Sequence, residues 1–475
     1  MSTSVGADPH PIELVTSLWM SMLEYEDPLP EDNWFDLGGD SLGAVQLIAR
    51  LERLDVRVGS TEFFAAPTLE TLLACADSQS GRGQISTEEI ASASHDLPLT
   101  PTQLYTVVAD GPTRDWHNDH FTVALCEHAD RGRLGRALAD LVTRHPALTA
   151  RFLRSERGWT QSVTSADQRV IALIDVPVEG LHDVGPVKTA VDHWGARFDL
   201  ARGPLCVALV WNTDSGPLAV TVLLHHLCVD GHSIGVLHND LVTALHEKSD
   251  IETTSDNYVA WLTHVATHDF VRADLASTDQ GTVPMQSLRT TTVELDVGSL
   301  HSRHIAPALV AAFSRTARDR VDPSRNRLDF TWHGRDVAAG WPSLANTVGW
   351  FAQIRRLVLP NDGAWSVTDA EVALAEATDG DYLVDDFTGR LLAQPARLYL
   401  NYRGALLTNL HARIGDCQPM DVDFGPQSSP DAITGHHLRC VADRFGDRVR
   451  LSIKYRPDSS LAAAGLDALA AGLER

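Results

Sequence analysis

The sequence predicts a small all-α bundle followed by a larger α/β body. Three observations predict this fold class: apolar residues at helical spacing in the first 78 positions, almost no large apolar residues at 78–96, and strand-like runs alternating with helix-like stretches beyond. A chain of 475 residues, 44% of them hydrophobic and 21% charged, has the length and composition for two or three compact units.

The N-terminal bundle is predicted from its apolar periodicity. Two segments carry apolar residues that share one helix face, and a third begins after Pro67. These residues are Ile12, Leu14, Val15, Leu18, Trp19 and Leu23; Leu42, Val45, Leu47, Ile48, Leu51 and Leu54; and Leu69, Leu72 and Leu73. The polar stretch after them is typical of a flexible linker.

The body is predicted to mix strands and helices. Apolar runs at 121–126, 205–211 and 218–224 have the length and composition of strands, and amphipathic stretches at 134–144 and 234–245 have those of helices. This alternation indicates an α/β fold.

Charge and cysteine usage limit the function classes. With 39 Lys+Arg against 63 Asp+Glu, the net charge is −24, and the only lysines are Lys188, Lys248 and Lys454. Nucleic acid and anionic membranes are therefore not expected as partners, because both require clustered basic residues. Six scattered cysteines without a CxxC spacing predict buried thiols rather than disulfides or zinc ligands. Without a signal-like segment or a membrane-spanning apolar run, we expect a soluble, cytoplasmic protein.

One serine lies at the predicted start of the second helix. In the segment NWFDLGGDSL at 33–42, Gly38 and Gly39 allow a tight turn and Ser41 opens the helix. A phosphodiester on Ser41 would lie where free backbone N–H groups and the helix dipole favour an anion. The alternative is that Ser41 only caps the helix.

The surroundings of Ser41 resemble the peptidyl carrier proteins of nonribosomal peptide synthetases, over about residues 10–78. The resemblance rests on FDLGGDSL at 35–42, the preceding helix, Phe63-Phe64 and Pro67-Thr68-Leu69. It implies a four-helix bundle in which Ser41 carries covalent 4′-phosphopantetheine, whose thiol holds the growing chain as a thioester, and a phosphopantetheinyl transferase as a partner. The 14 acids against three arginines in the first 80 residues would steer such a mobile module, or form only a solvated face.

The buried strand predicted at 218–224 ends in two histidines. His225 and His226 are followed by Asp230 and Gly231, and strand alternation sends the two rings to opposite sides. A single histidine in such a run is usually a core residue, but this HHxxxDG pattern resembles the condensation-domain superfamily. That resemblance implies two lobes similar to chloramphenicol acetyltransferase around a tunnel.

Further segments match this superfamily in its order, over about 97–470. They are RHPALTARF at 144–152, FDLARGPL at 198–205, YVAW at 258–261 and VGWF at 348–351. We therefore predict a carrier domain at 1–78, a linker at 79–96 and a condensation-like domain at 97–475, with an N-lobe at about 97–270 and a C-lobe at about 285–475. By family position, residues 421–430 are expected to cross from the second lobe to the first.

Site roles follow from the chemistry of the reaction. Joining an amine to a thioester requires alignment and removal of a proton, which suits a neutral imidazole near pH 7. His226 is the predicted base or positioner, with His225 beside it. Asp230 is expected to be structural and paired with Arg335, and Gly231 to let the backbone approach the thioester.

No metal site is predicted. His264 and His268 are four residues apart and could share a helix face, but no third ligand is apparent. His436-His437 lacks the following aspartate and glycine and is expected only to start a strand.

The motifs are divided between two activities of the superfamily. Epimerization character appears in LTPTQ at 99–103, in GGDS, in HGR at 333–335, in TVGWF at 347–351 and in LNYRG at 400–404. Epimerization domains carry a glutamate two residues before the HGR histidine, however, and this sequence has Thr331 there, which is no acid or base near neutral pH. Asp329 and Asp336 do not obviously replace that glutamate, and 231–237 lacks the tryptophan usual in epimerization domains.

The sequence therefore favours condensation, in which the acyl group on Ser41 passes to an amine or hydroxyl acceptor. Epimerization of the carrier-bound residue and a non-catalytic recruitment domain are the alternatives; the intact HHxxxDG motif argues against recruitment. The expected partners are other synthetase modules: an adenylation domain, and a downstream carrier or a free amine as acceptor. The stretch 261–291 is shorter than expected for a full condensation domain.

Overall fold

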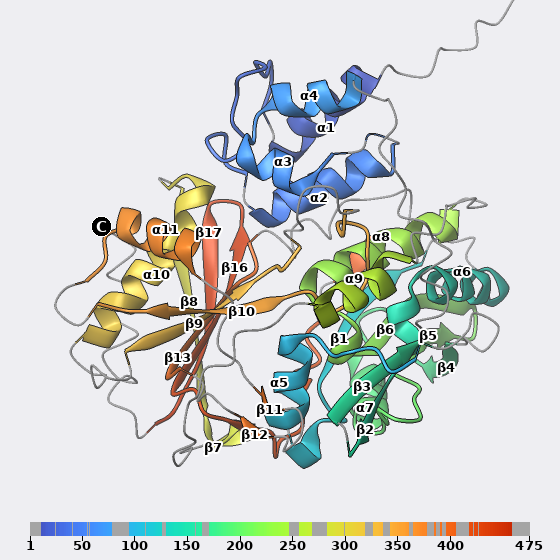
Figure 1. Ribbon diagram of the computed structural model, residues 1–475. Helices are drawn as coiled ribbons and strands as arrows, with labels where there is room; N and C mark the ends of the chain where they lie inside the picture. The colour runs from blue at the N-terminus through green and yellow to red at the C-terminus, as the bar shows by residue number, and fades with distance from the viewer. Residues whose placement is uncertain are drawn as a thin grey trace, which may run out of the picture.

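The computed structural model shows a helical bundle seated on a two-lobed α/β body (Figure 1). It describes residues 11–23, 25–39, 41–54, 56, 58–77, 95–109, 111–125, 130–156, 158–163, 171–246, 256–267, 283–298, 300–318, 326–335, 343–360, 364–377, 384–385, 390–391, 396–404, 418–420, 422–425 and 427–457.

The N-terminal bundle has four helices around an aromatic core. Trp19 and Trp34 pack edge to face with ring centroids 5.4 Å apart, and Phe63 packs against Trp34 at 6.5 Å. The three helices predicted from periodicity are present, and a short additional one precedes Pro67. The helices are α1 Pro11–Leu23, α2 Ser41–Glu52, α3 Ser60–Ala65 and α4 Leu69–Asp77.

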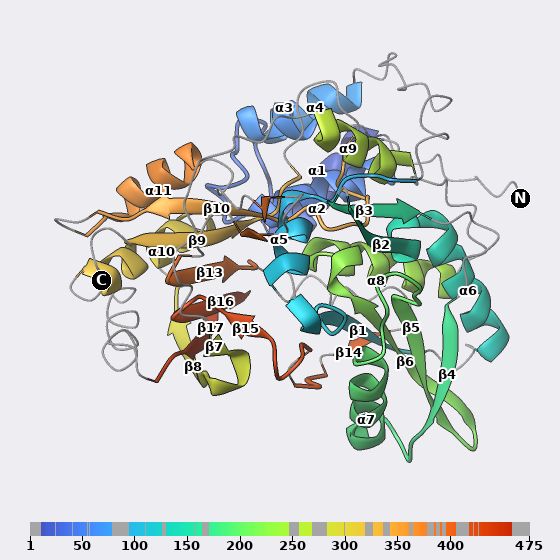
Figure 2. The same cartoon turned by 60° about the horizontal axis from the view of Figure 1, so that its bottom comes forward.

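The first lobe is built on a five-stranded sheet of order β14-β1-β6-β5-β4, in which α7 packs on β4, β5 and β6 (Figure 2). The central strands β5 and β6 are almost entirely buried, as their apolar runs predict. The elements up to the end of this region are α5 Pro101–Ala109, β1 Asn118–Ala124, α6 Arg131–Arg144, β2 Ala150–Ser155, β3 Gly158–Val163, β4 Ala172–Pro177, α7 Val184–Gly195, β5 Cys206–Thr213, β6 Gly216–His225, α8 Gly231–His246 and α9 Asp256–Thr267.

The second lobe is built on a six-stranded sheet of order β10-β9-β13-β16-β17-β8. Strand β13 is parallel to both β9 and β16, whereas the other pairs are antiparallel. Helices α10 and α11 pack on one another at its side (Figure 1). The main elements are β8 Arg289–Asp296, α10 Ser302–Arg318, β9 Arg327–Trp332, β10 Gln353–Val358, α11 Val367–Glu376, β13 Leu398–Tyr402, β16 Leu438–Phe445 and β17 Arg448–Tyr455.

Short elements complete the chain. They include the 3-10 turns η1 Gly111–Thr113, η2 Pro146–Thr149, η4 His226–Cys228 and η5 Met285–Ser287, and the strand pairs β7 Val283–Pro284 with β15 Ile433–Thr434 and β11 Val384–Asp385 with β12 Arg390–Leu391.

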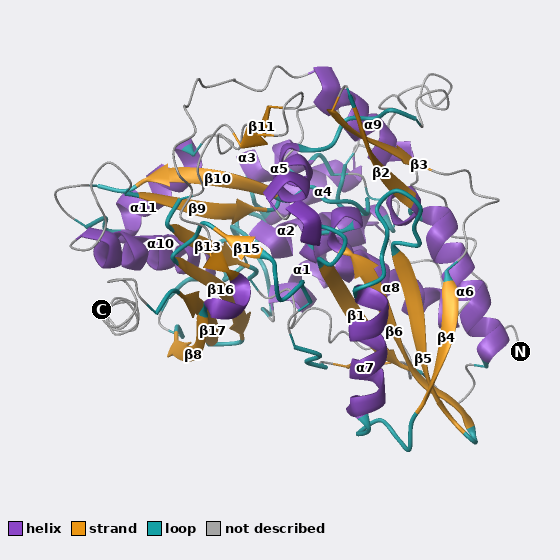
Figure 3. Cartoon of the chain, turned by 90° about the horizontal axis from the view of Figure 1, so that it is seen from below, coloured by secondary structure: helices purple, strands orange, loops and turns teal. Residues whose placement is uncertain are grey.

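Late in the sequence, the chain crosses from the second lobe to the first. Strand β14 (Gln418–Met420) pairs antiparallel with β1 in the first sheet, with Thr122 opposite Met420. A few residues later, Asn118 N donates to Gln427 O at 2.7 Å and Ser429 N donates to Trp116 O at 2.9 Å. The described part of the 421–430 segment therefore lies against the first lobe, as expected. Seen from below, the two sheets lie side by side (Figure 3).

None of the helices in the described ranges is both long and apolar enough to cross a membrane.

Candidate functional site

The two histidines of the motif have different surroundings. His225, the last residue of β6, is fully buried, and both ring nitrogens are engaged: Nε2 donates to Arg114 O at 2.8 Å, and Nδ1 accepts from Leu227 N at 3.2 Å. These bonds fix the ring in the first-lobe core. His226 begins the 3-10 turn η4 instead, where the strand has ended.

His226 lies against two aromatic rings at the lobe junction. Its ring centroid is 4.2 Å from that of Trp350 and 4.9 Å from that of His117. Its Nδ1 is buried and has no hydrogen-bond partner among the described residues. Burial and then the nearby His117 hold the pKa of His226 below its usual value of about 6.5. The imidazole is therefore neutral at pH 7 and able to accept a proton.

His117 is a site residue that the sequence did not single out. It directly precedes β1, whose first residue, Asn118, pairs with His225 on β6, and its carbonyl oxygen accepts from His226 N at 2.8 Å. The antiparallel pairing of β1 and β6 brings it to the motif. No local pattern in the sequence gives that pairing, so only a predicted strand register could have found His117.

Asp230 and Arg335 form a buried ion pair between the lobes. Arg335 Nη2 lies 2.9 Å from Asp230 Oδ1, and both side chains are at most 4% exposed. Oδ1 also accepts from Ser233 N and Oγ at 2.8 Å each, and Oδ2 accepts from Phe351 N at 3.0 Å. Burial alone would raise the pKa of Asp230, but Arg335 and these donors hold it below its usual range.

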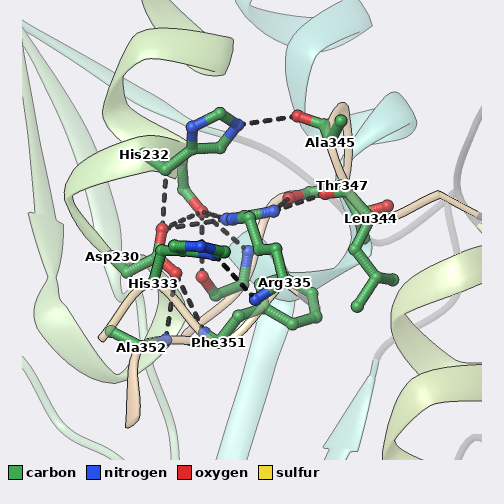
Figure 4. A network of polar contacts seen from close by, with 11 residues as sticks. Asp230, His232, His333, Arg335, Leu344, Ala345, Thr347, Phe351 and Ala352 are labelled. Carbon is green, nitrogen blue, oxygen red and sulfur yellow. Dashed lines mark hydrogen bonds and ion pairs between the residues drawn. The ribbon is translucent and has the colours of Figure 1, made fainter. Parts of the chain in front are cut away.

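The same arginine binds two backbone carbonyls. Arg335 Nη1 donates to Leu344 O and, at 2.8 Å, to Thr347 O, while His232 Nε2 donates to Ala345 O at 2.7 Å (Figure 4). Gly231 is the first residue of α8, directly after the aspartate. The network fixes the start of α8 and hence the turn that carries His226.

The position of the missing glutamate holds no acid. Thr331 Oγ1 is 2.9 Å from Tyr399 OH. Asp329 is fully buried and bound by Arg356 at 2.8 Å and by His436 Nε2 at 3.3 Å, so its charge is compensated within the second lobe. Asp336 lies outside the described residues. Asp329, the described carboxylate nearest in sequence to Thr331, therefore does not replace the glutamate.

The loop before Ser41 requires glycine. Gly38 has φ +100°, and a Cβ on Gly39 would lie 2.2 Å from the Trp34 indole. This turn delivers the chain to Ser41, the first residue of the twelve-residue α2, where the N–H groups of the first helical turn and the helix dipole favour an anion. The backbone thus fits a phosphodiester on Ser41. When bound, 4′-phosphopantetheine supplies a terminal thiol that holds an acyl group as a thioester.

The bundle is seated on both lobes by specific contacts. Arg53, after α2, lies 2.8 Å from Asp240 on α8 of the first lobe. At the other end, Arg303 on α10 pairs with Asp36 of the loop before Ser41, and Arg444 Nη1 donates to Gly38 O at 3.2 Å. The loop that delivers Ser41 therefore faces the second lobe, and the end of α2 faces the first.

An aromatic contact lies between these two ends. Phe64 of α3 stacks on the ring of His333, the HGR histidine, with centroids 6.0 Å apart.

Among the residues that the structure describes, no three His, Cys, Asp or Glu side chains are grouped to hold a metal ion. His264 lies on α9, but its side chain is not described, and His268 is outside the described ranges.

We expect acid to destabilise the folded chain through His232. Burial and then Arg335 lower its pKa to about 3, whereas an unfolded histidine titrates near 6.5. Between those values the unfolded state binds a proton that the folded state does not, so stability falls as the pH drops below about 6.5. From pH 7 to pH 5 the loss is about 2 kcal/mol. Thermal midpoints at both pH values measure this loss of stability. His232→Gln keeps a side-chain N–H donor but cannot take up the proton, so its thermal midpoint should fall less between pH 7 and pH 5. An equal fall in both proteins would contradict the role of His232.

Two family models match the chain. The model described as "Phosphopantetheine attachment site" matches residues 13–76, and the model described as "Condensation domain" matches residues 93–274. The first spans most of the four-helix bundle with Ser41, and the second spans the first lobe except β14, with the HHxxxDG motif.

Curated relatives of the chain include two much longer synthases. N-(5-amino-5-carboxypentanoyl)-L-cysteinyl-D-valine synthase of Amycolatopsis lactamdurans is 27% identical over 73% of this chain and 10% of its own length. Bacitracin synthase 3 of Bacillus licheniformis is 22% identical over 71% of this chain and 6% of its own length. The chain thus spans a tenth or less of the length of these relatives.

Solved structures share the fold of the body. The epimerization domain from the third module of tyrocidine synthetase B has a TM-score of 0.60 at 18% identity, covering 80% of this chain and 95% of that one. The X-domain from teicoplanin biosynthesis has a TM-score of 0.60 at 19% identity, covering 80% and 94%. The body therefore shares its two-lobed fold with both of these solved domains.

Proposed function

We propose that this chain, a phosphopantetheine carrier domain joined to a condensation-superfamily domain, forms an amide bond by passing the acyl group held at Ser41 to an amine. The observation that carries the proposal is a neutral, half-buried His226 on an intact Asp230–Arg335 scaffold, within a body on which the carrier itself is seated. A hydroxyl acceptor would give an ester by the same route.

The chain's own residues have separate tasks in this proposal. His226 takes the proton that the amine loses as the carbon–nitrogen bond forms, or holds the amine in line with the carbonyl. Asp230 and Arg335 keep the turn of His226 rigid, His225 anchors the strand before it, and Gly231 leaves the backbone free to approach the acyl group.

Intact-protein mass spectrometry tests the proposal. The chain is loaded at Ser41 with an aminoacyl-pantetheine and incubated in deuterated buffer with and without an amine acceptor, beside His226→Ala and the unloadable Ser41→Ala. Loss of the acyl group that requires both the acceptor and His226 is the expected result. An acyl group that is retained without any deuterium uptake would favour a recruitment role instead.

Epimerization is the second candidate because a second ring adjoins His226. His117, with its ring centroid 4.9 Å from that of His226, places a second imidazole at the site, whereas Thr331 has no acid or base group. Proton exchange at the α-carbon would then place deuterium on the retained acyl group without an acceptor. This outcome in the same experiment would replace condensation as the primary activity.

Partners and location belong to the same proposal. A phosphopantetheinyl transferase and an adenylation domain would load Ser41, and a downstream carrier or free amine would accept the acyl group. The thiols of Cys206, Cys228 and Cys440 are buried and unpaired, and burial raises the pKa of Cys228 and of Cys440 to about 12. Such protonated thiols suit the cytosol, where we place the chain.

Reversing one charge should unseat the carrier. Arg53→Glu would put a carboxylate against Asp240, which is 5% exposed and already holds Arg144 and His145. Because Arg53 is about one-third exposed, we expect a cost of about 1–2 kcal/mol, roughly tenfold in the docked population. Small-angle X-ray scattering should then report a larger radius of gyration. Arg136→Glu, at an exposed position of α6, is the control, and equal dimensions for both variants would contradict the seat.

A further inference from the structure

Residues 344–352, which we call the bridging loop, contact the carrier on one side. Ala345 is 2% exposed and packs within the apolar core of the carrier bundle. Asn346 Nδ2 donates to Ala49 O at 2.8 Å and to Glu52 Oε2 at 3.1 Å, and its Oδ1 accepts from Arg53 Nε at 2.9 Å. Ala49 O is one of the last-turn carbonyls of α2, so Asn346 helps to cap a helix of another domain. A carboxylate or an apolar side chain could not both donate and accept here.

The other side of the bridging loop contacts the catalytic motif. Its carbonyls accept from Arg335, His232 and Ser233: Thr347 O at 2.8 Å, Ala345 O at 2.7 Å and Gly349 O at 2.8 Å. Its amides at Phe351 and Ala352 donate to Asp230 Oδ2 at 3.0 and 3.3 Å, and its Trp350 ring lies 4.2 Å from that of His226. Figure 4 shows the contacts that Ala345, Thr347, Phe351 and Ala352 of the loop make with His232, Arg335 and Asp230.

Most of these motif contacts are made by the main chain of the loop. Their geometry therefore depends on where the loop's backbone lies, and Asn346 lies between two of the carbonyls involved, at 345 and 347. The rest of the bridging loop is anchored in the first-lobe core by Leu344, Val348, Trp350 and Phe351. The segment that the carrier can move is thus the part around Ala345 and Asn346.

We infer that Asn346 is a positioning residue that recognises the seated carrier and, through the bridging loop, holds the His226 site in its working geometry. The inference deepens the proposed function and rests on it for the assumption that the seated carrier is the one His226 serves. In the undocked chain, the loop loses the three hydrogen bonds of Asn346 and the apolar cover of Ala345, and its carbonyls are less firmly held against His232 and Arg335.

Arg53 gives a second link to the motif from the carrier side. It contacts Asn346 Oδ1 and, at 2.8 Å, Asp240 of α8, the helix whose first residue is Gly231. A substitution of Arg53 changes the sequence of the carrier alone, so any change it causes at residues 226–236 is transmitted through Asn346 or through Asp240.

Hydrogen exchange of the full, unloaded chain tests the inference. We compare wild type with Arg53→Gln, Asn346→Ala and the control Arg303→Gln, which removes the carrier contact to Asp36 without touching the bridging loop. Peptides covering 41–52, 226–236 and 344–352 are followed by mass spectrometry. Arg53→Gln and Asn346→Ala should speed exchange roughly fivefold in all three peptides, and Arg303→Gln should leave 226–236 at the wild-type rate.

Three outcomes would overturn the inference. Faster exchange confined to 41–52 would make Asn346 a docking contact only, and an equal rise at 226–236 in Arg303→Gln would place the transmission outside the loop. Unchanged exchange in all peptides would likewise reject it. Asn346→Ala could change exchange simply by misfolding the condensation-like domain. Arg53→Gln leaves the sequence of that domain intact, so it provides an independent test.

Turnover of a soluble aminoacyl thioester adds a functional readout. Compared with the wild-type chain, whose unloaded carrier is docked, Arg53→Gln and Asn346→Ala should lower kcat at an unchanged KM, since the effect acts on the geometry at His226 and not on binding of the soluble substrate. Unchanged kcat in both variants would contradict coupling. If the wild-type chain is inactive on every thioester, the proposed function is wrong. The hydrogen-exchange rates of the variants would still decide the role of Asn346.

Discussion

Replacing His226 with alanine should lower the rate of acyl transfer by about 10²–10⁴-fold, the range for removal of a positioned acid–base group. The reason is local: His226 is held neutral by burial and by His117, and its ring lies 4.2 Å from that of Trp350, whereas the His117 ring is 6.1 Å from it. Single-turnover loss of the acyl group from the loaded chain measures the rate. The acid limb of the rate should lie below pH 6.5, because the pKa of His226 is lowered.

His225→Ala is the matched control for this prediction. It removes the neighbouring ring and with it the bonds to Arg114 O and Leu227 N, so it should lower the thermal midpoint more than His226→Ala does. A His226→Ala chain that is folded and retains the wild-type rate would show that alignment by other residues is sufficient.

Breaking the ion pair between Asp230 and Arg335 should cause the largest loss of stability. Arg335→Ala leaves a buried carboxylate without its cation and two carbonyls, Leu344 O and Thr347 O, without a donor, which costs about 3–5 kcal/mol. Since the two residues come from different lobes, the junction that contains His226 should loosen first. Chemical unfolding followed by tryptophan fluorescence measures the change.

Two comparisons sharpen this prediction. Arg450→Ala removes an exposed pair with Glu294 and should cost far less stability than Arg335→Ala. The double variant Asp230→Asn with Arg335→Met removes both charges and should be more stable than Arg335→Ala alone. Equal losses for Arg335→Ala and Arg450→Ala would mean that the buried pair adds nothing beyond a surface contact.

Elements with strong periodicity could be predicted from the sequence. The helix expected at 134–144 is Arg131–Arg144, and the one expected at 234–245 is Gly231–His246. The apolar stripe of α6 packs on α8, and α8 in turn packs on β1, so both stripes are recorded in a local pattern. The six-residue α3 is not visible in the periodicity because it is too short to repeat an apolar stripe.

The candidate site could be predicted only where a local motif encodes it. Ser41 and the HHxxxDG residues are encoded in short segments. Strand pairing and domain docking bring three further residues to the site: His117, Trp350, which packs on His226, and Asn346. Both processes depend on residues that are far apart in the chain. Nothing in the spacing of Asn346 distinguishes it from a loop asparagine.

The late strand β14 also has a consequence for synthesis on the ribosome. Its partner β1 emerges early, yet the pairing of Thr122 with Met420 must wait for about 300 further residues, or roughly 15–60 s at 5–20 residues per second. Until then β1 is an open sheet edge able to pair with other nascent chains. Folding of the first lobe thus ends only after most of the second lobe has been synthesised. A chain terminated before residue 418 would keep the unpaired edge of β1.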